Sequence, residues 1–199
     1  MNKYENDYLN ELNNNDINYN EVQQIKYDPM TDSDIHYYFP NSKIMTVNEI
    51  SKFKTIDELL PNNIDYIFIL WEASKNRGHW CLIIKDRKNN LIEYFDPYGY
   101  YYTAPIYWVG SGMREVLNLK PYIKNLLENS NYNIEWNGFN FQNKTDKQMS
   151  TCGRHCCFRL ITFLNHRITL NEYITLMKGL KKRTKMTFDE IVSDLINKI

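Results

Sequence analysis

Residues 65–96, DYIFILWEASKNRGHWCLIIKDRKNNLIEYFD, carry the strongest β-strand signal in the chain. They contain three apolar runs, Asp65–Trp71, His79–Lys85 and Leu91–Asp96, which are rich in β-branched and aromatic residues. The first run is almost continuously apolar, which is typical of a strand buried on both faces. The polar residues Asp86–Asn89 between the second and third runs predict a hairpin turn. This stretch therefore predicts the centre of a β-sheet.

Helical periodicity lies on both sides of these strands. Helices are predicted at Val47–Leu60, Leu119–Leu127, Cys152–Arg167, Leu170–Leu180 and Phe188–Ile199. Two further short strands are predicted at Lys43–Val47 and Asn133–Phe141. Thr187 and Glu190 have the spacing of a capping box for the last helix.

The helix predicted at 152–167 has the clearest pattern of all. Its apolar positions follow helical spacing and make one buried face; they are Cys157, Leu160, Ile161 and Leu164. Its polar positions make the opposite stripe; they are His155, Arg159, Thr162 and His166. We therefore expect an amphipathic helix with one face in the core.

Composition restricts the class of protein. The chain has 199 residues, with 24 basic and 24 acidic side chains and a formal net charge of zero. This balance argues against a globally basic nucleic-acid coat. No apolar run approaches the roughly 18 residues of a transmembrane helix, so we expect no membrane contact. Four Cys residues, two of them adjacent, do not suggest a disulfide framework and favour a reducing compartment.

The domain organisation is predicted to be simple. Residues 1–25 carry scattered Asn and acidic residues with few aliphatic ones, so we expect a flexible or loosely docked segment. Residues 26–199 are then expected to form a single domain.

Cys152 lies where a polar loop becomes the predicted helix 152–167. A thiol at a helix N-terminus meets unpaired N–H groups and the positive end of the helix dipole, and both favour the nucleophilic thiolate. Gly153 would let a substrate backbone approach closely. A small residue at a helix start is the alternative interpretation of Cys152. The other three cysteines are assigned to packing.

His79 and Asp96 are predicted to face each other across the hairpin. If Asp86–Asn89 is a four-residue turn, the register places the two residues directly opposite, with Cβ atoms about 4.5–5.5 Å apart. A carboxylate at that spacing can orient an imidazole. The argument depends on the turn length, because a slip of one residue would put the side chains on opposite faces.

A thiol, a histidine and an acid together suggest a Cys-His-Asp constellation for acyl transfer. An oxyanion hole would complete it, built from the backbone N–H of Cys152 and a side-chain amide. The candidates for this amide are Gln142 and Gln148. We prefer Gln142, because it follows the predicted strand 133–141, whereas Gln148 lies in the loop before the thiol.

These motifs resemble a known family. Gly78-His79-Trp80, Phe95-Asp96-Pro97-Tyr98-Gly99, a Gln, and Thr151-Cys152-Gly153-Arg154-His155-Cys156-Cys157 are similar to the adenovirus-type maturation proteases, a group that includes the SUMO-removing proteases. The proteases of virophages and polinton-like viruses look most similar. The resemblance runs from about Met30 to the C-terminus. The stretch between Gln and Cys is longer here than in the adenoviral enzyme, so Gln148 remains an alternative.

The resemblance implies an α+β, adenain-like cysteine protease fold, in which a mixed β-sheet is flanked by helices and the nucleophile begins a helix. It implies Cys152 as nucleophile, His79 as general base and acid, Asp96 as orienting carboxylate and Gln142 as oxyanion donor. Trp80 and Gly153 would line the substrate site. No metal is implied and no cofactor is required, although DNA activates adenoviral relatives.

The implied function is cleavage of viral capsid or core precursors during virion maturation. The resemblance also implies that the protein acts as a monomer. Its expected locations are the virion and the host cytoplasm, at the virus factory. Two alternatives of the same fold are a deconjugase acting on ubiquitin-like modifiers and a catalytically inactive binding module. A zinc site formed by Cys152, His155, Cys156 and His79 is a further alternative, but it lacks a second well-spaced ligand pair.

The segment Lys178–Lys185, KGLKKRTK, has five basic residues in eight positions. The simplest interpretation is a solvated linker between two helices. The resemblance also suggests DNA binding here, through Lys181, Lys182 and Arg183.

Overall fold

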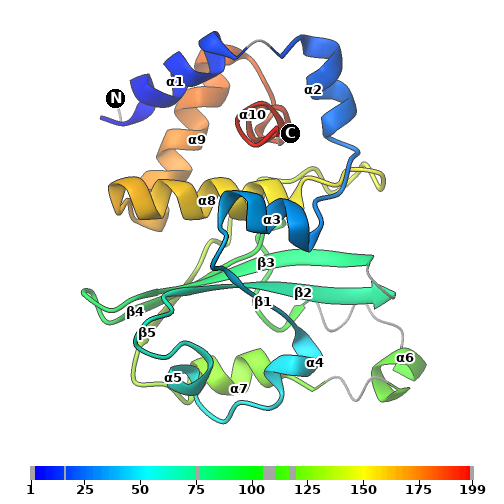
Figure 1. The fold of residues 1–199 in the computed structure, drawn as a ribbon, viewed down its shortest axis with the longest axis vertical. Helices are drawn as coiled ribbons and strands as arrows, with labels where there is room; N and C mark the ends of the chain where they lie inside the picture. The colour runs from blue at the N-terminus through cyan, green and yellow to red at the C-terminus, as the bar shows by residue number, and fades with distance from the viewer. Residues whose placement is uncertain (1–2, 16, 75–76, 105–110, 117–119, 198–199) are drawn as a thin grey trace. The chain divides into compact units, whose positions relative to one another are not determined.

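The computed structural model describes residues 3–15, 17–74, 77–104, 111–116 and 120–197 (Figure 1). They form two compact units. The first, called the sheet unit, comprises Asn41–Gly138. The second, called the helical unit, comprises Met1–Pro40 and Phe139–Ile199, and is therefore built from two separate stretches of chain.

The sheet unit contains a five-stranded sheet in the order β1-β2-β3-β4-β5. The strands are β1 (Lys43–Thr46), β2 (Tyr66–Ser74), β3 (Arg77–Asp86), β4 (Leu91–Phe95) and β5 (Asn133–Trp136). Strands β2, β3 and β4 are antiparallel neighbours, whereas β1 pairs with β2 and β5 with β4 in parallel. The predicted α+β class with a mixed sheet is thus confirmed, and the three apolar runs form its centre.

The hairpin between β3 and β4 has a register two residues away from the predicted one. Asp86 pairs with Leu91, and Leu82 pairs with Phe95. The turn is displaced because Asn90 adopts a left-handed conformation (φ 50°) and Asp86 accepts hydrogen bonds from the backbone of the turn. A shift of two residues keeps every side chain on its expected face of the sheet.

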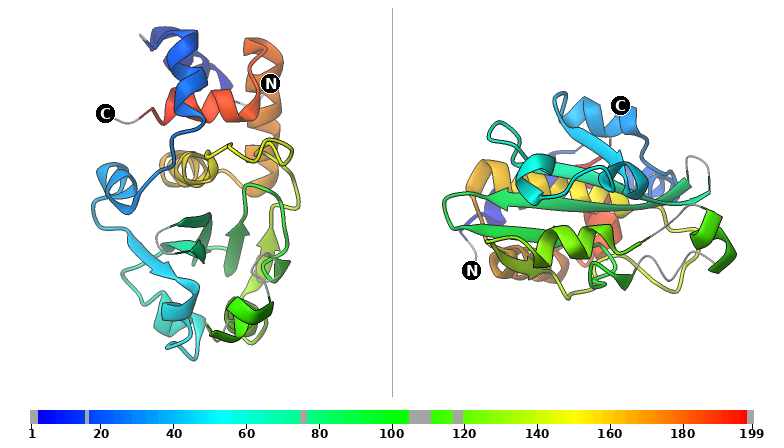
Figure 2. Two further views of the ribbon diagram at one scale, coloured as in Figure 1. Left: turned by 90° about the vertical axis from the view of Figure 1, so that its right-hand side faces the viewer. Right: turned by 90° about the horizontal axis from the view of Figure 1, so that it is seen from below.

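Short helices cover one face of the sheet within this unit (Figure 2). They are α4 (Val47–Ile50), α5 (Ile56–Leu59) and α7 (Tyr122–Glu128), and a further helix, α6 (Ser111–Val116), precedes α7. The single helix predicted at 47–60 is instead two helices, because Thr46 and Thr55 each cap a separate start. Apolar side chains of α4, α5 and α7 pack with inward-facing residues of β2, β3 and β4.

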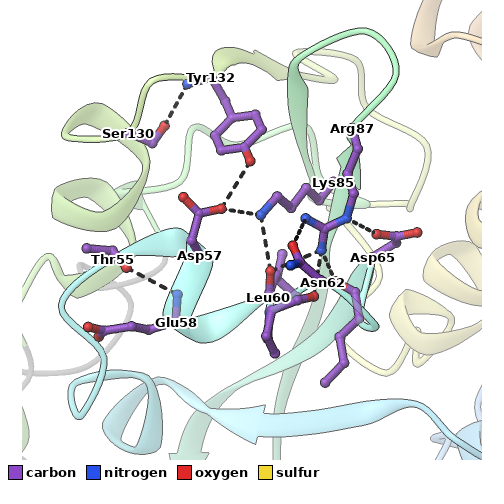
Figure 3. Close-up of polar contacts among 12 residues, drawn as sticks. Thr55, Asp57, Glu58, Leu60, Asn62, Asp65, Lys85, Arg87, Ser130 and Tyr132 are labelled. Atoms are coloured by element: carbon purple, nitrogen blue, oxygen red, sulfur yellow. Dashed lines mark hydrogen bonds and ion pairs between the residues drawn. The ribbon is translucent and has the colours of Figure 1, made fainter.

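A polar network secures the end of β3 that lies away from His79 (Figure 3). The fully buried ammonium of Lys85 donates to the carboxylate of Asp57 and to the carbonyl of Leu60. Arg87 donates to the carboxylate of Asp65 at 2.7 Å and to three carbonyl oxygens, those of Leu60, Pro61 and Ile64. These bonds attach the segment between α5 and β2 to the central hairpin.

The helical unit is assembled around α10, which contacts α1, α2, α8 and α9 (Figure 1). Its helices are α1 (Glu5–Asn14), α2 (Tyr19–Ile25), α3 (Asp32–Tyr38), α8 (Cys152–His166), α9 (Leu170–Thr184) and α10 (Phe188–Leu195). The predicted capping box of Thr187 and Glu190 is present at the start of α10. None of the helices in the described part of the chain is long and apolar enough to cross a membrane.

The N-terminal segment, expected to be flexible or loosely docked, is helical in the described residues. Asn18 and Glu21 form a capping box that starts α2. Tyr8 of α1 packs edge-on against Phe158, with ring centroids 5.0 Å apart, and Val22 of α2 is buried. Tertiary burial therefore compensates for the low content of aliphatic residues. That residues 26–199 form a single domain stays a prediction.

Candidate active site

His79 and Asp96 are hydrogen-bonded inside the sheet unit. His79 lies near the start of β3, and Asp96 directly follows β4. The imidazole Nε2 of His79 is 3.0 Å from Oδ1 of Asp96, and both side chains are buried. The predicted contact between these two residues therefore exists.

The observed register brings His79 and Asp96 together by a different geometry from the predicted one. Continuing the β3–β4 pairing by one residue places Asp96 opposite Cys81, two positions along β3 from His79. His79 and Asp96 are thus diagonal neighbours on one face, and long side chains can still meet at that spacing. Cys81 becomes the third member of the same cluster.

The backbone of Asp96 is fixed by Asn137, which follows β5. The Asn137 side chain accepts the Asp96 N–H at 2.9 Å and donates to the Asp96 carbonyl at 2.6 Å. These two bonds continue the pairing of β4 and β5 by one residue through a side chain. Oδ1 of Asp96 also accepts the backbone N–H of Tyr98 at 2.7 Å. The carboxylate is therefore aimed at His79 by bonds on both sides.

Tyr98 also covers His79 directly. The two rings stack with centroids 4.7 Å apart and planes inclined by 19°. Tyr98 and Asn137 were not predicted as site residues. Tyr98 lies in the Asp-Pro-Tyr-Gly motif, which offered a signal, whereas the position of Asn137 depends on a long-range parallel pairing with no local signature.

Cys81 is held in a buried network rather than in purely apolar packing. It hydrogen-bonds with His79 and Tyr94, and Tyr94 accepts a bond from the indole of Trp71 at 3.3 Å. Burial, with a smaller contribution from the charge of Asp96, raises the pKa of Cys81 to about 12. The thiol therefore stays protonated at neutral pH and is a poor nucleophile.

His79, Cys81 and Asp96 form the one group of potential metal ligands in the described residues, with their ligand atoms within 4.8 Å of one another. The direct hydrogen bond between His79 and Asp96 and the protonated thiol of Cys81 fit a hydrogen-bonded cluster better than a zinc site. The zinc site considered from the sequence also used Cys152, His155 and Cys156. These three residues form no such group of potential metal ligands among the described residues.

Cys152 is the first residue of α8 in the helical unit, and Gly153 follows it in the first turn. The backbone N–H groups of a first helical turn have no partner within the helix, so they are available to an anion. Cys152 has a relative exposure of 9%, compared with 0% for each of the other three cysteines. None of the four forms a disulfide within the described part of the chain.

The exposure of the thiols predicts their order of alkylation. We expect iodoacetamide to label Cys152 first and to inactivate the protein, since burial raises the pKa of Cys81 and Cys157 and keeps them as thiols. Peptide mapping by mass spectrometry after partial labelling checks this order. EDTA is expected to leave the activity unchanged. Faster labelling of Cys81, or activity lost on chelation, would contradict the assignment.

Most of the polar stripe of α8 is buried, contrary to the amphipathic pattern expected from the sequence, and only His166 of the stripe is partly exposed. Of the predicted buried face, Cys157 and Leu160 are fully buried, whereas Ile161 and Leu164 are partly exposed. His155, Arg159 and Thr162 are all fully buried. The guanidinium of Arg159 lies over the ring of Tyr173, 5.2 Å from its centroid, and donates to the carbonyl of Ile168. Polar residues at helical spacing here mark internal hydrogen bonds rather than a solvated face.

The first turn of α8 is tied to α10 by Asp189. Oδ1 of Asp189 accepts the hydroxyl of Thr151 at 2.5 Å and the Nε2 of His155 at 3.1 Å. Oδ2 accepts the backbone N–H of Asn143 at 3.0 Å. Asp189 was not predicted as a site residue, because an acid in the first turn of a helix is common on electrostatic grounds alone.

Gln142 is buried in the helical unit, in the loop that leads to α8. The strand predicted to reach residue 141 ends at Trp136, so Gln142 does not sit at a strand end. The side chain of Gln142 is held in place instead by a hydrogen bond from its Nε2 to the carbonyl of Met149, at 3.2 Å. Because an amide nitrogen carries two hydrogens, Gln142 can make this bond and still donate a second one. Gln148 is exposed.

Substitution should separate the two glutamines. We expect Gln142→Ala to lower kcat by about 10²–10³-fold, as the loss of an oxyanion donor does. Gln148→Ala, at an exposed position of the same loop, should have a mild effect and serves as the matched control. Steady-state kinetics on a peptide substrate measure both. The reverse ranking would assign the oxyanion donor to Gln148.

The substrate roles of Trp80 and Gly153 stay predictions. Trp80 is buried in β3, and because side chains alternate along a strand, it points to the opposite face of the sheet from His79. His79 and Asp96 belong to the sheet unit, whereas Gln142, Cys152 and Gly153 belong to the helical unit. The pairing of Cys152 with His79 therefore also stays a prediction.

The basic segment is the end of α9 rather than a linker, since the helix runs to Thr184. Lys181 lies over the ring of Phe188, 4.7 Å from its centroid. Arg183 donates to the side chain of Asn6 at 3.2 Å. These cations keep exposed side chains, and their place in the last helical turn is favourable for the helix dipole. DNA binding by Lys181, Lys182 and Arg183 stays a prediction.

Salt dependence tests this DNA prediction. Replacing Lys181, Lys182 and Arg183 together by Ala should weaken binding of duplex DNA and reduce the slope of log K against log salt by about 1–3, because fewer counterions are released. Fluorescence titrations at several salt concentrations measure the slope. The matched control removes three exposed lysines of the sheet unit, Lys52, Lys54 and Lys88. No binding at low salt, or equal effects of both triple variants, would refute the prediction.

Comparison with known proteins identifies a family and a viral relative. The profile of the Ulp1 protease family, C-terminal catalytic domain, matches residues 22–195, which include all four candidate catalytic residues. Protein V9 of Sputnik virophage is 33% identical over 153 residues, which make up 76% of this chain and 84% of V9.

Two solved structures match the chain at much lower identity. One is the SUMO protease Ulp1 with its catalytic cysteine oxidised to a sulfinic acid, with 12% identity and a TM-score of 0.38 over 98% of this chain and 97% of Ulp1. Another is the Chlamydia trachomatis effector ChlaDUB1, with 16% identity and a TM-score of 0.38 over 88% of this chain and 90% of that one.

Proposed function

The chain belongs to the Ulp1 protease family and is a cysteine peptidase, and from this premise we propose that Cys152 is its nucleophile, His79 its general base and acid, and Asp96 the carboxylate that orients His79. Gln142 is proposed as the side-chain donor of the oxyanion hole. The observation that supports this assignment best is the 3.0 Å hydrogen bond between His79 and Asp96.

This bond selects the tautomer of His79. An ionised carboxylate only accepts hydrogen bonds, so Nε2 of His79 carries the hydrogen that Asp96 accepts. Nδ1 is then the ring nitrogen able to take a proton from the thiol of Cys152. Asp96 also stabilises the imidazolium that forms when the proton arrives.

The proposed reaction follows the usual course of acyl transfer. The proton of the Cys152 thiol moves to His79, and the thiolate attacks the carbonyl carbon of the scissile peptide bond. The oxygen becomes negative and accepts hydrogen bonds from Gln142 and from the backbone N–H of Cys152. His79 then protonates the leaving amine. Water, deprotonated by His79, hydrolyses the thioester and regenerates the thiol.

We propose structural precursors of a virus, in the capsid or core, as the substrates. The similarity to protein V9 of Sputnik virophage, at 33% identity, supports a viral setting. The virion and the host cytoplasm are the corresponding proposed locations. We also propose that the protein acts as a monomer without a metal, and that DNA is a candidate activator.

A substrate panel tests this function. Purified protein is incubated with viral structural precursors and, separately, with proteins conjugated to ubiquitin-like modifiers, in the presence and absence of duplex DNA. Internal cleavage of a precursor supports endopeptidase activity. Release of intact modifiers alone would instead indicate a deconjugase. No turnover of any substrate, with Cys152 unlabelled by activity-based thiol probes, would indicate an inactive binding module.

A further inference from the structure

The loop that joins Gln142 to Cys152 is held at both ends by one carboxylate. Asp189 is 3% exposed and lies in the first turn of α10. Its Oδ2 accepts the backbone N–H of Asn143, the residue after Gln142. Its Oδ1 accepts the hydroxyl of Thr151, the residue before Cys152. A single side chain thus contacts the neighbours of both proposed catalytic groups.

We propose that Asp189 is a positioning residue that fixes the Gln142 amide relative to the backbone N–H of Cys152. This role rests on the function proposed above, in which these two groups form the oxyanion hole. Asp189 itself does not touch the substrate. It acts through Asn143 and Thr151, and through His155, one turn into α8.

The length of this loop explains why hydrogen bonds at both of its ends are needed to hold Gln142 and Cys152 in place. Catalytic groups must be held within about 0.5 Å of their productive geometry, and groups on loops are less precisely placed than groups on regular elements. Gln142 is not on a strand, and the intervening segment contains no helix or strand. Two bonds at its ends remove much of the conformational freedom of the backbone between them.

The hydroxyl of Thr151 is used in an unusual way that points to the same role. Thr151 occupies the N-cap position of α8, where a threonine normally accepts a bond from a backbone N–H of the first turn. Its side chain makes no such bond here and donates to Asp189 instead. The side chain of Thr151 therefore accepts no hydrogen bond from the backbone N–H groups of the first turn of α8.

The charge of Asp189 is maintained despite its burial. Burial by itself raises the pKa of the carboxyl, but the hydrogen bonds from His155, Thr151 and Asn143 outweigh it and lower the pKa below its ordinary value. Hydrogen bonds to an ionised acceptor are stronger than those between neutral groups. The ionised carboxylate can therefore hold three donors at once.

The experiment compares variants that differ in one hydrogen-bonding group. Asp189→Asn keeps the shape but replaces one acceptor oxygen by a donor. Thr151→Val removes the hydroxyl at constant shape, and Thr151→Ser retains it. Asp194→Asn is the matched control, since Asp194 is a buried acid of the same helix that bonds to Asn15 instead of the loop. Each variant is assayed for kcat and KM at a temperature where circular dichroism shows the native fold.

We expect Asp189→Asn and Thr151→Val to lower kcat by about 10- to 100-fold with KM little changed, because the oxyanion donors act in the transition state. Thr151→Ser and Asp194→Asn should keep kcat near that of the wild type. Hydrogen exchange of the Asn143 amide should accelerate in Asp189→Asn and stay unchanged in Asp194→Asn.

Several results would overturn the role of Asp189. Wild-type kcat in both Asp189→Asn and Thr151→Val would do so, and so would an equal loss in Thr151→Ser and Thr151→Val. If Asp189→Asn does not fold, the two Thr151 variants decide the question. A wild-type protein that cleaves no peptide would refute the proposed function and, with it, this role. An active wild type with unaffected variants would refute this role alone.

Discussion

Replacing Cys152 by alanine is expected to lower kcat/KM by at least about 10⁴-fold while the fold stays intact. The reason is that alanine has no group able to form the covalent intermediate. Cys152 is the start of α8, and a smaller side chain there is compatible with a helical first turn. Peptide cleavage by purified protein measures the loss, and circular dichroism measures the fold.

Cys156→Ala is the matched control for this variant. Cys156 lies one turn further along α8 and is fully buried, so its replacement removes the same atom from the same helix. We expect some loss of thermal stability from the small cavity but a rate close to that of the wild type. Cleavage at the wild-type rate by Cys152→Ala would show that the nucleophile has been wrongly assigned.

Replacing His79 by glutamine is expected to lower kcat by about 10³–10⁴-fold, because glutamine cannot accept the proton of the thiol. Iodoacetamide should also label Cys152 more slowly in this variant, since the thiolate loses its partner cation. Steady-state kinetics and timed labelling with mass spectrometry measure the two effects. His166→Gln, at the other end of α8, is the control and should behave like the wild type.

Asp96→Asn refines the prediction for His79. Both described hydrogen bonds to the carboxylate, from His79 and from Tyr98, go to the same oxygen, Oδ1. An asparagine can keep that oxygen in place and lose only the negative charge. We therefore expect a smaller loss than in His79→Gln. Activity in His79→Gln equal to that of the wild type would remove His79 from the mechanism.

The sheet was predictable because its signals are local. The apolar runs around Phe68, Leu82 and Tyr94 are long and bounded by polar residues, and each forms a central strand. The hairpin register was wrong by two residues because the turn depends on the left-handed conformation of Asn90, which the sequence only permits. The prediction that His79 and Asp96 lie on the same face of the sheet was still right, because the side-chain period of a strand is two residues.

The remainder of the candidate site depends on contacts between distant parts of the chain. The bonds of Asn137 to Asp96 require the parallel pairing of β4 with β5, and those of Asp189 to Thr151 require α10 to pack beside α8. The hydrophobic periodicity of a sequence indicates local helices and strands, and it does not reveal contacts between distant segments. The buried polar stripe of α8 has the same origin, since His155 is polar by sequence and internal only because Asp189 meets it.

The division of the chain into two units has a consequence for the order of events during synthesis. The sheet unit is one continuous stretch and has all its residues once Gly138 has left the ribosome. The helical unit must wait for both of its stretches, since Arg154, two residues after Cys152, donates to the carbonyls of Asp28 and Ile196. Because a compact unit can fold only when all of its residues are available, we expect the framework of the proposed nucleophile to form after the sheet unit. A nascent chain would thus acquire peptidase activity only after nearly every described residue had been translated.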